Sequence, residues 1–475
     1  MTASVAAIDL GATSGRVIAG AVGPDLLTIR QVARFDNGPT RTPDGIHWNA
    51  QDLYSRALEG LGAAVRWDSA IASVGVDSWA VDYALLAGDR VLGEPFHYRD
   101  ERTAAGVARV HAGVPHSELY ARNGLQFLPF NTLYQLAAED PTGAYGVADT
   151  MLLIPDLLGF YLTGRKVAER TNASTTGLLA IASGEWDVAL MSKLGLRPGL
   201  LPPLVEPGQL VGPLLPAVVE QTGLAAGTPV VAVGSHDTAS AVVGTPMTEQ
   251  GGAFISCGTW GLVGIELERP VLAPAAREAN FTNEGGVDGR TRFLHNVMGL
   301  WLLSESMRTW ERQGEGADLG RLLAQAEAIT TNVAVFDTND ARLLAPGDMP
   351  ARIAEICTES NLPVPRTQPE FARSIIESLA SAFAAAVHQA SDLAGASINR
   401  IHLTGGGALN DLLCQRTADR SGLPVVAGPV EATAVGNVLI QGRALGAVGG
   451  SLESLRDIVA RTFKPRVFEP KGPPR

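Results

Sequence analysis

The residues with the clearest chemistry lie in a short turn near the start of the chain, within residues 7–16. An apolar run ends in the acidic Asp9, and a polar stretch that begins at Gly11 follows directly. Glycines let backbone N–H groups approach a ligand closely, and hydroxyl and guanidinium groups supply donors that suit phosphate. Asp9 would repel a phosphate and is better suited to a bridging divalent cation. The turn therefore predicts a nucleotide-phosphate site, although it would indicate an ordinary β-turn if it stood alone.

Two further glycine turns occur later in the chain. The strand-like residues 253–267 are interrupted by Gly258 and Thr259, and residues 401–410 contain a strand that ends in three glycines. Alternating apolar residues on both sides of the turns in residues 7–16 and 253–267 are typical of hairpins. Neither a P-loop nor a dinucleotide-binding spacing follows Asp9. Two related hairpins about half a chain apart indicate duplicated domains, so we expect two similar lobes that hold one nucleotide.

A candidate catalytic group follows another predicted strand, residues 229–233, in the sequence GSHDT of residues 234–238. Ligands bind at the carboxyl ends of strands in open α/β sheets, and phosphoryl transfer needs a carboxylate that accepts the proton of the nucleophile. Asp237 suits that role. The same residue types are also typical of a helix N-cap, and this segment alone favours neither interpretation. The phosphate-binding turns elsewhere in the chain favour the catalytic one.

The elements around these residues alternate between strand and helix, which is the pattern of an α/β protein. Residues 50–67 form an amphipathic helix pattern after the capping residue Asn49, and residues 371–393 form the clearest helix, followed by Gly395. Strands are expected over residues 400–404 and 423–427, on either side of a helix.

Residues 74–86 alternate between apolar and smaller or polar side chains and predict one strand. Asp77 and Asp82 are then interpreted as surface charges. Trp79 is either a half-buried aromatic residue of that strand or a platform on which a sugar ring stacks, and the first interpretation is slightly favoured.

Composition limits the class of protein. The chain of 475 residues is long enough for two domains, and 46% hydrophobic and 18% charged residues are typical of globular proteins. A net charge of −12 argues against a nucleic-acid partner. The three cysteines lack metal-ligand spacing and fit reduced thiols, and no segment resembles a signal peptide or a membrane span. We expect a cytoplasmic protein without nucleic-acid or membrane partners.

Ten phrases in chain order resemble the FGGY family of carbohydrate kinases, and the likeness extends from the first strand to about Gly446. The phrases are DLGATSGR, GVDSWAVD, HYRDERT, FNTLYQL, GSHDTASAV, SCGTW, NFTNEGG, HNVMGLWLL, TGGGALN and AGPVEATAVGN. The first and last glycine motifs are shared with the wider actin-like ATPase superfamily. PFNTLYQL, GSHDTAS and RFLHNVMGLWLL are more specific and resemble the branch that acts on L-rhamnulose. The resemblance implies an α/β fold of two actin-like ATPase (ribonuclease H-like) lobes, residues 1–248 and 249–475, with the active site in a cleft between them.

The resemblance also implies the reaction, in which the γ-phosphoryl group of Mg-ATP moves to O1 of L-rhamnulose. Asp237 would be the catalytic proton acceptor, and Asp9 would help to hold a hydrated Mg²⁺ ion. The implied sugar-binding residues are Ala80, His236, Asp237, Thr238 and Asn296. The implied ATP-binding residues are Ala12, Thr13, Ser14, Gly15, Arg16, Thr259, Ser304, Gly405 and Gly406. A monomer or a small homo-oligomer is expected.

Two residues depart from the pattern of that branch: Ala80 stands where glycine is usual, and Ser304 stands where glutamine is usual. The added methyl group of Ala80 would narrow the sugar pocket, so L-fuculose, xylulose and ribulose remain alternative substrates. An actin-like ATPase without a sugar substrate is the alternative from another class, and residues 236–238 argue against it.

Overall fold

The computed structural model describes residues 2–472 and divides into two compact units. Unit 1 contains the chain up to Thr248 together with Glu266–Phe293 and Ala432–Thr462. Unit 2 contains Glu249–Ile265, Leu294–Glu431 and the chain from Phe463 on. Unit 1 therefore consists of one long stretch and two shorter stretches from later in the chain.

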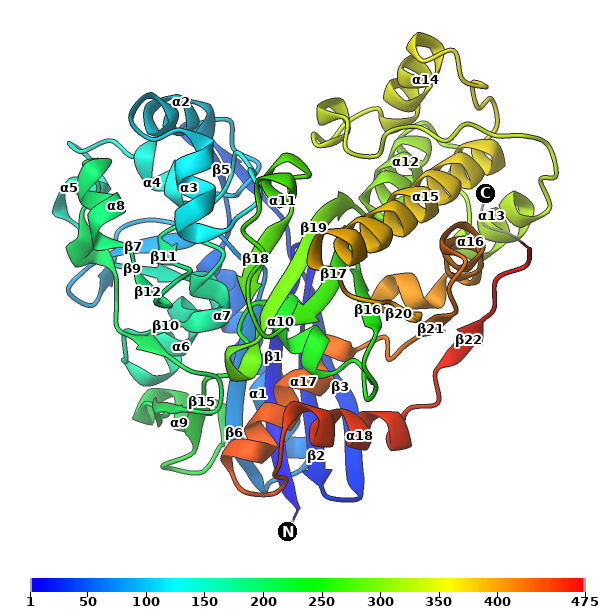
Figure 1. Ribbon diagram of the computed structural model, residues 1–475. Helices are drawn as coiled ribbons and strands as arrows, with labels where there is room; N and C mark the ends of the chain where they lie inside the picture. The colour runs from blue at the N-terminus through cyan, green and yellow to red at the C-terminus, as the bar shows by residue number, and fades with distance from the viewer. Residues whose placement is uncertain (1, 473–475) are drawn as a thin grey trace. The chain divides into compact units, whose positions relative to one another are not determined.

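Unit 1 is built on a six-stranded sheet with the strand order β14-β15-β6-β1-β2-β3 (Figure 1). The predicted hairpin of residues 7–16 is confirmed as the antiparallel pair β1–β2. Strand β6 is parallel to both β1 and β15, so the carboxyl ends of these three strands lie at one edge of the sheet. The strands are β1 (Ala3–Leu10), β2 (Ser14–Gly23), β3 (Leu26–Asp36), β6 (Ile71–Ser78), β14 (Leu210–Pro213) and β15 (Pro229–Val231).

Helices α1 (Ala50–Trp67) and α17 (Ala432–Ala444) cover opposite faces of this sheet. A Cβ atom on Gly60 of α1 would meet Val17 of β2, whereas a Cβ atom on Gly20 of β2 would meet Val438 of α17. Because side chains of a strand alternate between its faces, these contacts place the helices on different sides. The predicted helix 50–67 is confirmed, and its cap is the predicted Asn49.

The predicted single strand over residues 74–86 is wrong. Strand β6 ends at Ser78, and the chain turns through residues 79–82 before β7 (Tyr83–Ala87) begins. Strand β7 belongs to a different sheet, with the order β8-β7-β9. The turn contains Val81 with φ of 71°, a backbone conformation that β-branched residues rarely adopt.

The remaining elements of unit 1 are short. The helices are α2 (Thr103–Gly113), α3 (His116–Asn123), α4 (Thr132–Ala137), α5 (Ala144–Val147), α6 (Ile154–Thr163), α7 (Arg170–Ala173), α8 (Val188–Lys193), α9 (Pro216–Thr222), α10 (Asp237–Val243), α11 (Pro274–Glu278) and α18 (Leu452–Thr462). The strands are β4 (Thr40–Thr42), β5 (Gly45–His47), β8 (Arg90–Val91), β9 (Thr150–Leu153), β10 (Ala168–Glu169), β11 (Leu179–Ala180), β12 (Glu185–Trp186), β13 (Leu204–Val205) and β18 (Thr282–Gly285). The chain passes between the units within β17 (Trp260–Leu267) and β19 (Thr291–Met298).

Unit 2 contains a sheet with the strand order β19-β17-β16-β20-β21-β22. The predicted hairpin of residues 253–267 is confirmed as β16–β17, and the predicted strand 400–404 is confirmed as β20. The predicted long helix is α15 (Gln368–Ala394), which begins with a capping box at Thr367 and ends at Gly395. The other elements are β16 (Gly252–Cys257), β20 (Arg400–Thr404), β21 (Val425–Ala427), β22 (Arg466–Phe468), α12 (Trp301–Arg312), α13 (Leu319–Glu327), α14 (Met349–Glu359) and α16 (Asp411–Ser421). Across residues 2–472, no helix is both long enough and apolar enough to cross a membrane.

Candidate functional site

The carboxyl edge of the unit 1 sheet brings together residues that the sequence separates widely. Asp9 of β1 is directly opposite Asp77 of β6, and Leu10 is opposite Ser78. The Ser78 N–H donates to the carbonyl oxygen of Ser235 at 2.9 Å, which places the GSHDT segment beside the end of β6. This is the edge at which parallel sheets bind ligands. The predicted Asp9 and Asp237 therefore lie at the same edge of one sheet.

The predicted phosphate-binding turn, residues 12–16, is closed by a hydrogen bond from the Gly11 N–H to the carbonyl oxygen of Ser14 at 3.0 Å. The side chain of Asn37 donates to the carbonyl oxygen of Gly11 at 2.8 Å. A Cβ atom on Gly15 would lie 2.2 Å from the ring of Phe35, so any larger residue there would have to displace that ring. Arg16 donates through Nε to Asp9 Oδ2 at 2.8 Å. Arg16, which we expect to contact phosphate, therefore lies next to Asp9, which we expect to bind Mg²⁺.

Asp77 is fully buried beside Asp9, so its interpretation as a surface charge is wrong. Burial and the neighbouring Asp9 charge raise the pKa of Asp77 well above its ordinary value, and a hydrogen bond from Asn437 opposes that rise. The Oδ1 atom of Asp77 is buried without a hydrogen-bond partner. A divalent cation would relieve the repulsion between two such carboxylates.

This pair fits the predicted Mg²⁺ ion. The described residues contain no group of three or more Asp, Glu, His or Cys side chains that could hold a metal. Mg²⁺ in phosphate-transferring sites usually takes one or two carboxylates and completes its shell with waters and phosphate oxygens. Asp9 and Asp77 supply that smaller set.

Asp237 is the first residue of α10, and its side chain is about one-third exposed. The N-cap position is His236, which makes no side-chain capping bond. Ser235 does not cap the helix either, because its hydroxyl donates to Glu169 at 2.7 Å. The Asp237 carboxylate accepts a hydrogen bond from the Thr238 hydroxyl at 3.0 Å. The helix-cap alternative is therefore not what the structure shows, and Asp237 keeps access to a ligand.

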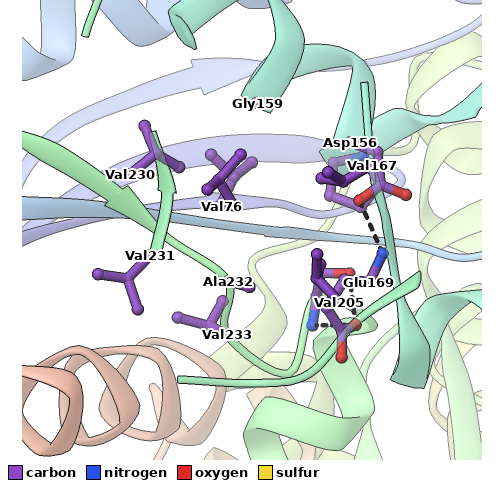
Figure 2. Close-up of a pocket in the computed structure, with 13 residues that line it drawn as sticks. Val76, Asp156, Gly159, Val167, Glu169, Val205, Val230, Val231, Ala232 and Val233 are labelled. Atoms are coloured by element: carbon purple, nitrogen blue, oxygen red, sulfur yellow. Dashed lines mark hydrogen bonds between the residues drawn. The ribbon is translucent and has the colours of Figure 1, made fainter. Parts of the chain in front are cut away.

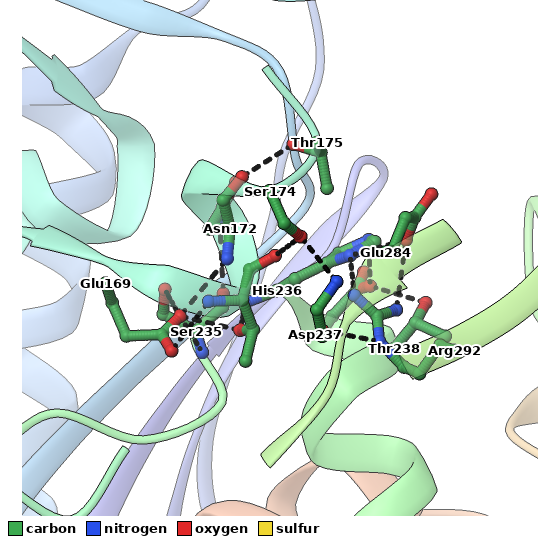
Figure 3. Close-up of polar contacts among 12 residues, drawn as sticks. Glu169, Asn172, Ser174, Thr175, Ser235, His236, Asp237, Thr238, Glu284 and Arg292 are labelled. Carbon is green, nitrogen blue, oxygen red and sulfur yellow. Dashed lines mark hydrogen bonds and ion pairs between the residues drawn. The ribbon is translucent and has the colours of Figure 1, made fainter. Parts of the chain in front are cut away.

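Glu169 fixes the backbone that carries Asp237. Its buried carboxylate accepts hydrogen bonds from both the N–H and the hydroxyl of Ser235, at 2.9 and 2.7 Å. The same carboxylate accepts from the N–H and the hydroxyl of Thr171 and from the N–H of Asn172. Burial raises the pKa of Glu169, and these donors oppose the rise. Figure 3 shows Glu169 on one side of the Ser235–His236 segment.

Arg292 and Glu284 hold the other side of His236 (Figure 3). The His236 Nδ1 atom lies 3.1 Å from Arg292 Nη2 and 3.3 Å from Glu284 Oε2. Arg292 is fully buried, pairs with Glu284 at 3.1 Å and donates to the carbonyl oxygen of Gly285. Burial alone would raise the pKa of Glu284, but Arg292 and His236 hold it below its ordinary value. With Nδ1 engaged, the His236 Nε2 atom faces Asp237 Oδ1 at 3.4 Å.

A small cavity of about 20 Å³ lies behind Glu169 and is lined mostly by valines (Figure 2). Asp156 borders it and accepts a hydrogen bond from the Glu169 N–H at 3.1 Å. Burial and the charge of Glu169 raise the pKa of Asp156 well above its ordinary value. A space of this size holds one water molecule at most, so the cavity is too small for a sugar or a nucleotide.

The turn of residues 79–82 follows β6 at the same sheet edge. Asp82 is buried, so its interpretation as a surface charge is wrong as well; burial raises its pKa from 3.8 to about 6. Trp79 is buried and donates its indole N–H to Asp82 at 3.0 Å, so its ring does not offer an open platform. Ala80, a predicted sugar contact, is half-buried.

The predicted site residues of unit 2 gather around two turns. The carbonyl oxygens of Gly258 and Thr259 accept hydrogen bonds from Leu300 and Gly299, just before α12. Gly405 has φ of 77°, and a Cβ atom there would lie 2.7 Å from the carbonyl oxygen of Cys257. The structure thus brings the predicted Thr259 and Gly405 turns together within unit 2. Ser304 is exposed on α12, and Asn296 is half-buried on β19.

Sequence reasoning missed the supporting residues Glu169, Glu284 and Arg292. A signal existed for two of them, because Glu284 lies in the phrase NFTNEGG and Arg292 begins the phrase RFLHNVMGLWLL. Both phrases contributed to the family resemblance, but that resemblance assigned no role to Glu284 or Arg292. Glu169 has no comparable signal, since its partner Ser235 lies 66 residues away.

Comparisons with known proteins agree over almost the entire chain. A family model described as the FGGY family of carbohydrate kinases, N-terminal domain, matches residues 4–244, and the C-terminal model of that family matches residues 253–445. A protein of Enterobacter sp. (strain 638) named rhamnulokinase is 39% identical over 471 residues, 98% of this chain and 94% of the relative. A rhamnulokinase of Pectobacterium atrosepticum is 40% identical over 475 residues, 99% of this chain and 93% of the relative.

Solved structures show the same fold at lower identity. A ligand-bound xylulose kinase from Lactobacillus acidophilus aligns with a TM-score of 0.79 at 18% identity, over 98% of this chain and 94% of that one. A glycerol kinase from Plasmodium falciparum with ADP aligns with a TM-score of 0.78 at 15% identity, over 99% and 94%. These likenesses confirm the predicted α/β fold class.

Proposed function

Because the chain belongs to the FGGY family of carbohydrate kinases, we propose that it transfers the γ-phosphoryl group of ATP to O1 of L-rhamnulose. The product would be L-rhamnulose 1-phosphate, an intermediate of L-rhamnose breakdown. The relatives named rhamnulokinase, which match this chain over 93–94% of their own length, support this choice of sugar. The structural observation that carries the proposal is the accessible Asp237 carboxylate beside a His236 ring that two buried charges hold in place.

In this proposal, Asp237 accepts the proton of the O1 hydroxyl as the oxygen attacks the γ-phosphorus. Such transfers depend mainly on positioning and charge neutralisation, so a fixed carboxylate is the main group the protein must supply. His236, Thr238, Ala80 and Asn296 would orient the sugar. Mg²⁺, held by Asp9 with Asp77 beside it, would neutralise charge on the phosphate oxygens when it is bound with ATP.

The nucleotide would be held by the remaining predicted residues. In unit 1, the N–H groups and hydroxyls of residues 12–15 suit phosphate oxygens, and Arg16 would place its charge next to them. In unit 2, Thr259, Ser304, Gly405 and Gly406 are assigned to ATP. A cytoplasmic setting is part of the proposal, and it fits three cysteines that are free and buried.

The test is a coupled ATP assay with L-rhamnulose, L-fuculose, D-xylulose and ribulose. We expect the highest kcat/KM with L-rhamnulose, and a clear preference for another ketose would overturn the choice of sugar. ATP hydrolysis that no ketose stimulates would overturn the kinase assignment itself.

The role of Asp237 is tested separately by Asp237→Asn, which keeps the size of the side chain and removes the base. We expect sugar and ATP binding close to those of the unaltered enzyme and a fall in kcat of about 10³-fold or more. Asp52→Asn, at a half-exposed carboxylate on α1, is the matched control and should leave kcat unchanged. Retention of most of the kcat in Asp237→Asn would exclude Asp237 as the base.

A further inference from the structure

The turn of residues 79–82 starts where the candidate site lies. The Trp79 N–H donates to the carbonyl oxygen of Leu10 at 3.2 Å, and the preceding Ser78 N–H donates to Ser235. The turn is therefore attached to both the strand that carries Asp9 and the segment that carries Asp237. Of its four residues, Ala80 alone is half-buried, whereas the other three are buried. Ala80 is thus the part of the turn that a ligand at this edge can reach.

The backbone of this turn is strained. The Asp82 N–H donates to the carbonyl oxygen of Ala80 at 3.0 Å, which closes a three-residue turn around Val81 with its φ of 71°. Three-residue turns with a positive central φ are rare, and a β-branched residue there persists only where the surroundings enforce it. The carbonyl oxygen of Val81 accepts hydrogen bonds from the Thr132 hydroxyl at 2.7 Å and from Gln135 Nε2 at 3.3 Å.

The Asp82 carboxylate supplies much of that enforcement. Its Oδ2 atom accepts hydrogen bonds from the indole N–H groups of Trp48 and Trp79, at 2.6 and 3.0 Å, and from the Tyr98 N–H at 3.2 Å. Its Oδ1 atom accepts from Gln135 Nε2 at 2.9 Å. One buried acid therefore ties the turn to three other segments of unit 1. The ring centroids of Trp48 and Trp79 lie 4.1 Å apart, so the two indoles move together if this acid is altered.

From these contacts we infer that Asp82 is a positioning residue for sugar binding. Its carboxylate holds the strained turn of residues 79–82 so that Ala80 contacts the sugar. The inference rests on the proposed function, because it takes the ligand at this edge to be a ketose. Only an ionised carboxylate can accept from four N–H donors with two oxygens and donate nothing. An amide would turn an N–H₂ group toward either Gln135 or the indoles, and the turn would lose one of its supports.

The experiment compares the steady-state kinetics of Asp82→Asn with those of the unaltered enzyme. The substrate is the ketose that the unaltered enzyme phosphorylates best. We expect the KM for that sugar to rise about tenfold or more, while the KM for ATP and the kcat change less than about threefold. The near-ultraviolet circular dichroism of the indoles should change as well, because the charged acceptor shared by Trp48 and Trp79 is replaced by a weaker neutral amide.

Asp187→Asn is the matched control. Asp187 is also a buried acid of unit 1 and accepts hydrogen bonds from Leu190 N–H and Arg122, but it caps α8 and does not contact the turn. The Asp187→Asn substitution should lower the stability of the protein without raising the KM for the sugar. If Asp82→Asn does not fold, Gln135→Met removes the donor to Asp82 and Val81 with little change of volume and should show the same rise in sugar KM.

A sugar KM that changes less than about threefold, or sugar and ATP KM values that rise together, would refute the positioning role. The same refutation follows if Asp187→Asn raises the sugar KM as much as Asp82→Asn. These outcomes are independent of which ketose is preferred, so a wrong choice of sugar under the proposed function leaves the test of Asp82 intact.

Discussion

Replacement of Arg292 by methionine tests whether the buried charges around His236 serve the reaction or only the fold. The guanidinium makes three contacts: an ion pair with Glu284, a contact with His236 Nδ1 and a hydrogen bond to the carbonyl oxygen of Gly285. Methionine has a similar length and no charge. Arg292→Met therefore leaves Glu284 buried without its cation and releases one side of the His236 ring.

The expected loss of stability follows from these contacts. Removal of one partner from a buried ion pair costs about 3–5 kcal/mol, because the other charge stays buried without compensation. In the unaltered protein, the lowered pKa of Glu284 contributes stability that is present above its ordinary pKa of 4.5 and is lost as the pH falls. In Arg292→Met, His236 remains but the guanidinium that opposes burial is lost, so the pKa of Glu284 rises. The stability difference between the two proteins should therefore be largest near neutral pH and shrink below about pH 5.

Arg456→Met supplies a matched control within unit 1. Arg456 is also buried, makes a bidentate ion pair with Glu266 and donates to the carbonyl oxygen of Val242, and it does not contact His236. Urea unfolding should show comparable losses for both variants. Under conditions where both are folded, kcat should fall by about 10²-fold in Arg292→Met only, because a displaced imidazole misorients the reacting groups. Equal kcat losses in both variants, or a kcat for Arg292→Met within about threefold of the unaltered value, would refute the reasoning.

Two further predictions concern the elements that support the site. The pKa of Asp82 is raised to about 6 from an ordinary 3.8, so the folded protein favours the protonated form of this residue. The stability that this preference contributes is complete below pH 3.8 and is lost as the pH rises to about 6. The difference in unfolding free energy between the unaltered protein and Asp82→Asn should thus change by about 3 kcal/mol across that window, and a difference that is flat with pH would contradict the assignment. In α17, a Cβ atom on Gly436 would lie 1.9 Å from the carbonyl oxygen of Ser240 in α10, so Gly436→Ala should cost about 1–3 kcal/mol in urea unfolding and lower activity through the displaced α10. Gly159→Ala in α6 has nothing within 4 Å of the added atom and should be neutral or stabilising by up to about 1 kcal/mol; equal losses in the two variants would contradict the packing argument.

The sequence predicted the local elements of this fold well where local rules decide them. The β1–β2 and β16–β17 hairpins, helix α1 with its Asn49 cap and helix α15 before Gly395 all follow from turn residues, capping and periodicity. The strand over residues 74–86 failed for a physical reason. Apolar alternation continues through Trp79, Val81 and Tyr83, although the chain turns there without a glycine or proline. Tertiary hydrogen bonds impose that turn, and no propensity anticipates valine at a positive φ.

The sequence suggested the candidate reacting groups but not the groups that hold them. Asp9 and Asp237 could be proposed because each lies near the carboxyl end of a predicted strand, beside residue types with known chemistry. Asp77 and Asp82 were misread because exposure of a charged residue is the usual outcome, and their partners are remote. Asp77 accepts from Asn437, 360 residues later, and Asp82 accepts from Trp48 and from Gln135, 53 residues later. Burial of a charge depends on contacts that only the fold creates.

The distribution of hydrogen bonds among these acids supports the assignment of Asp237 as the base. Glu169 accepts five hydrogen bonds and Asp82 accepts four, so donors from several segments hold both carboxylates in place. Among residues 2–472, the one hydrogen bond to the Asp237 carboxylate comes from the hydroxyl next to it in the chain. Hydrogen bonds donated to a carboxylate favour its ionised form, so a carboxylate with many donors is a poorer proton acceptor than one with few. Asp237 combines a backbone fixed by Glu169 with lone pairs left for a substrate, and this combination is what proton acceptance requires.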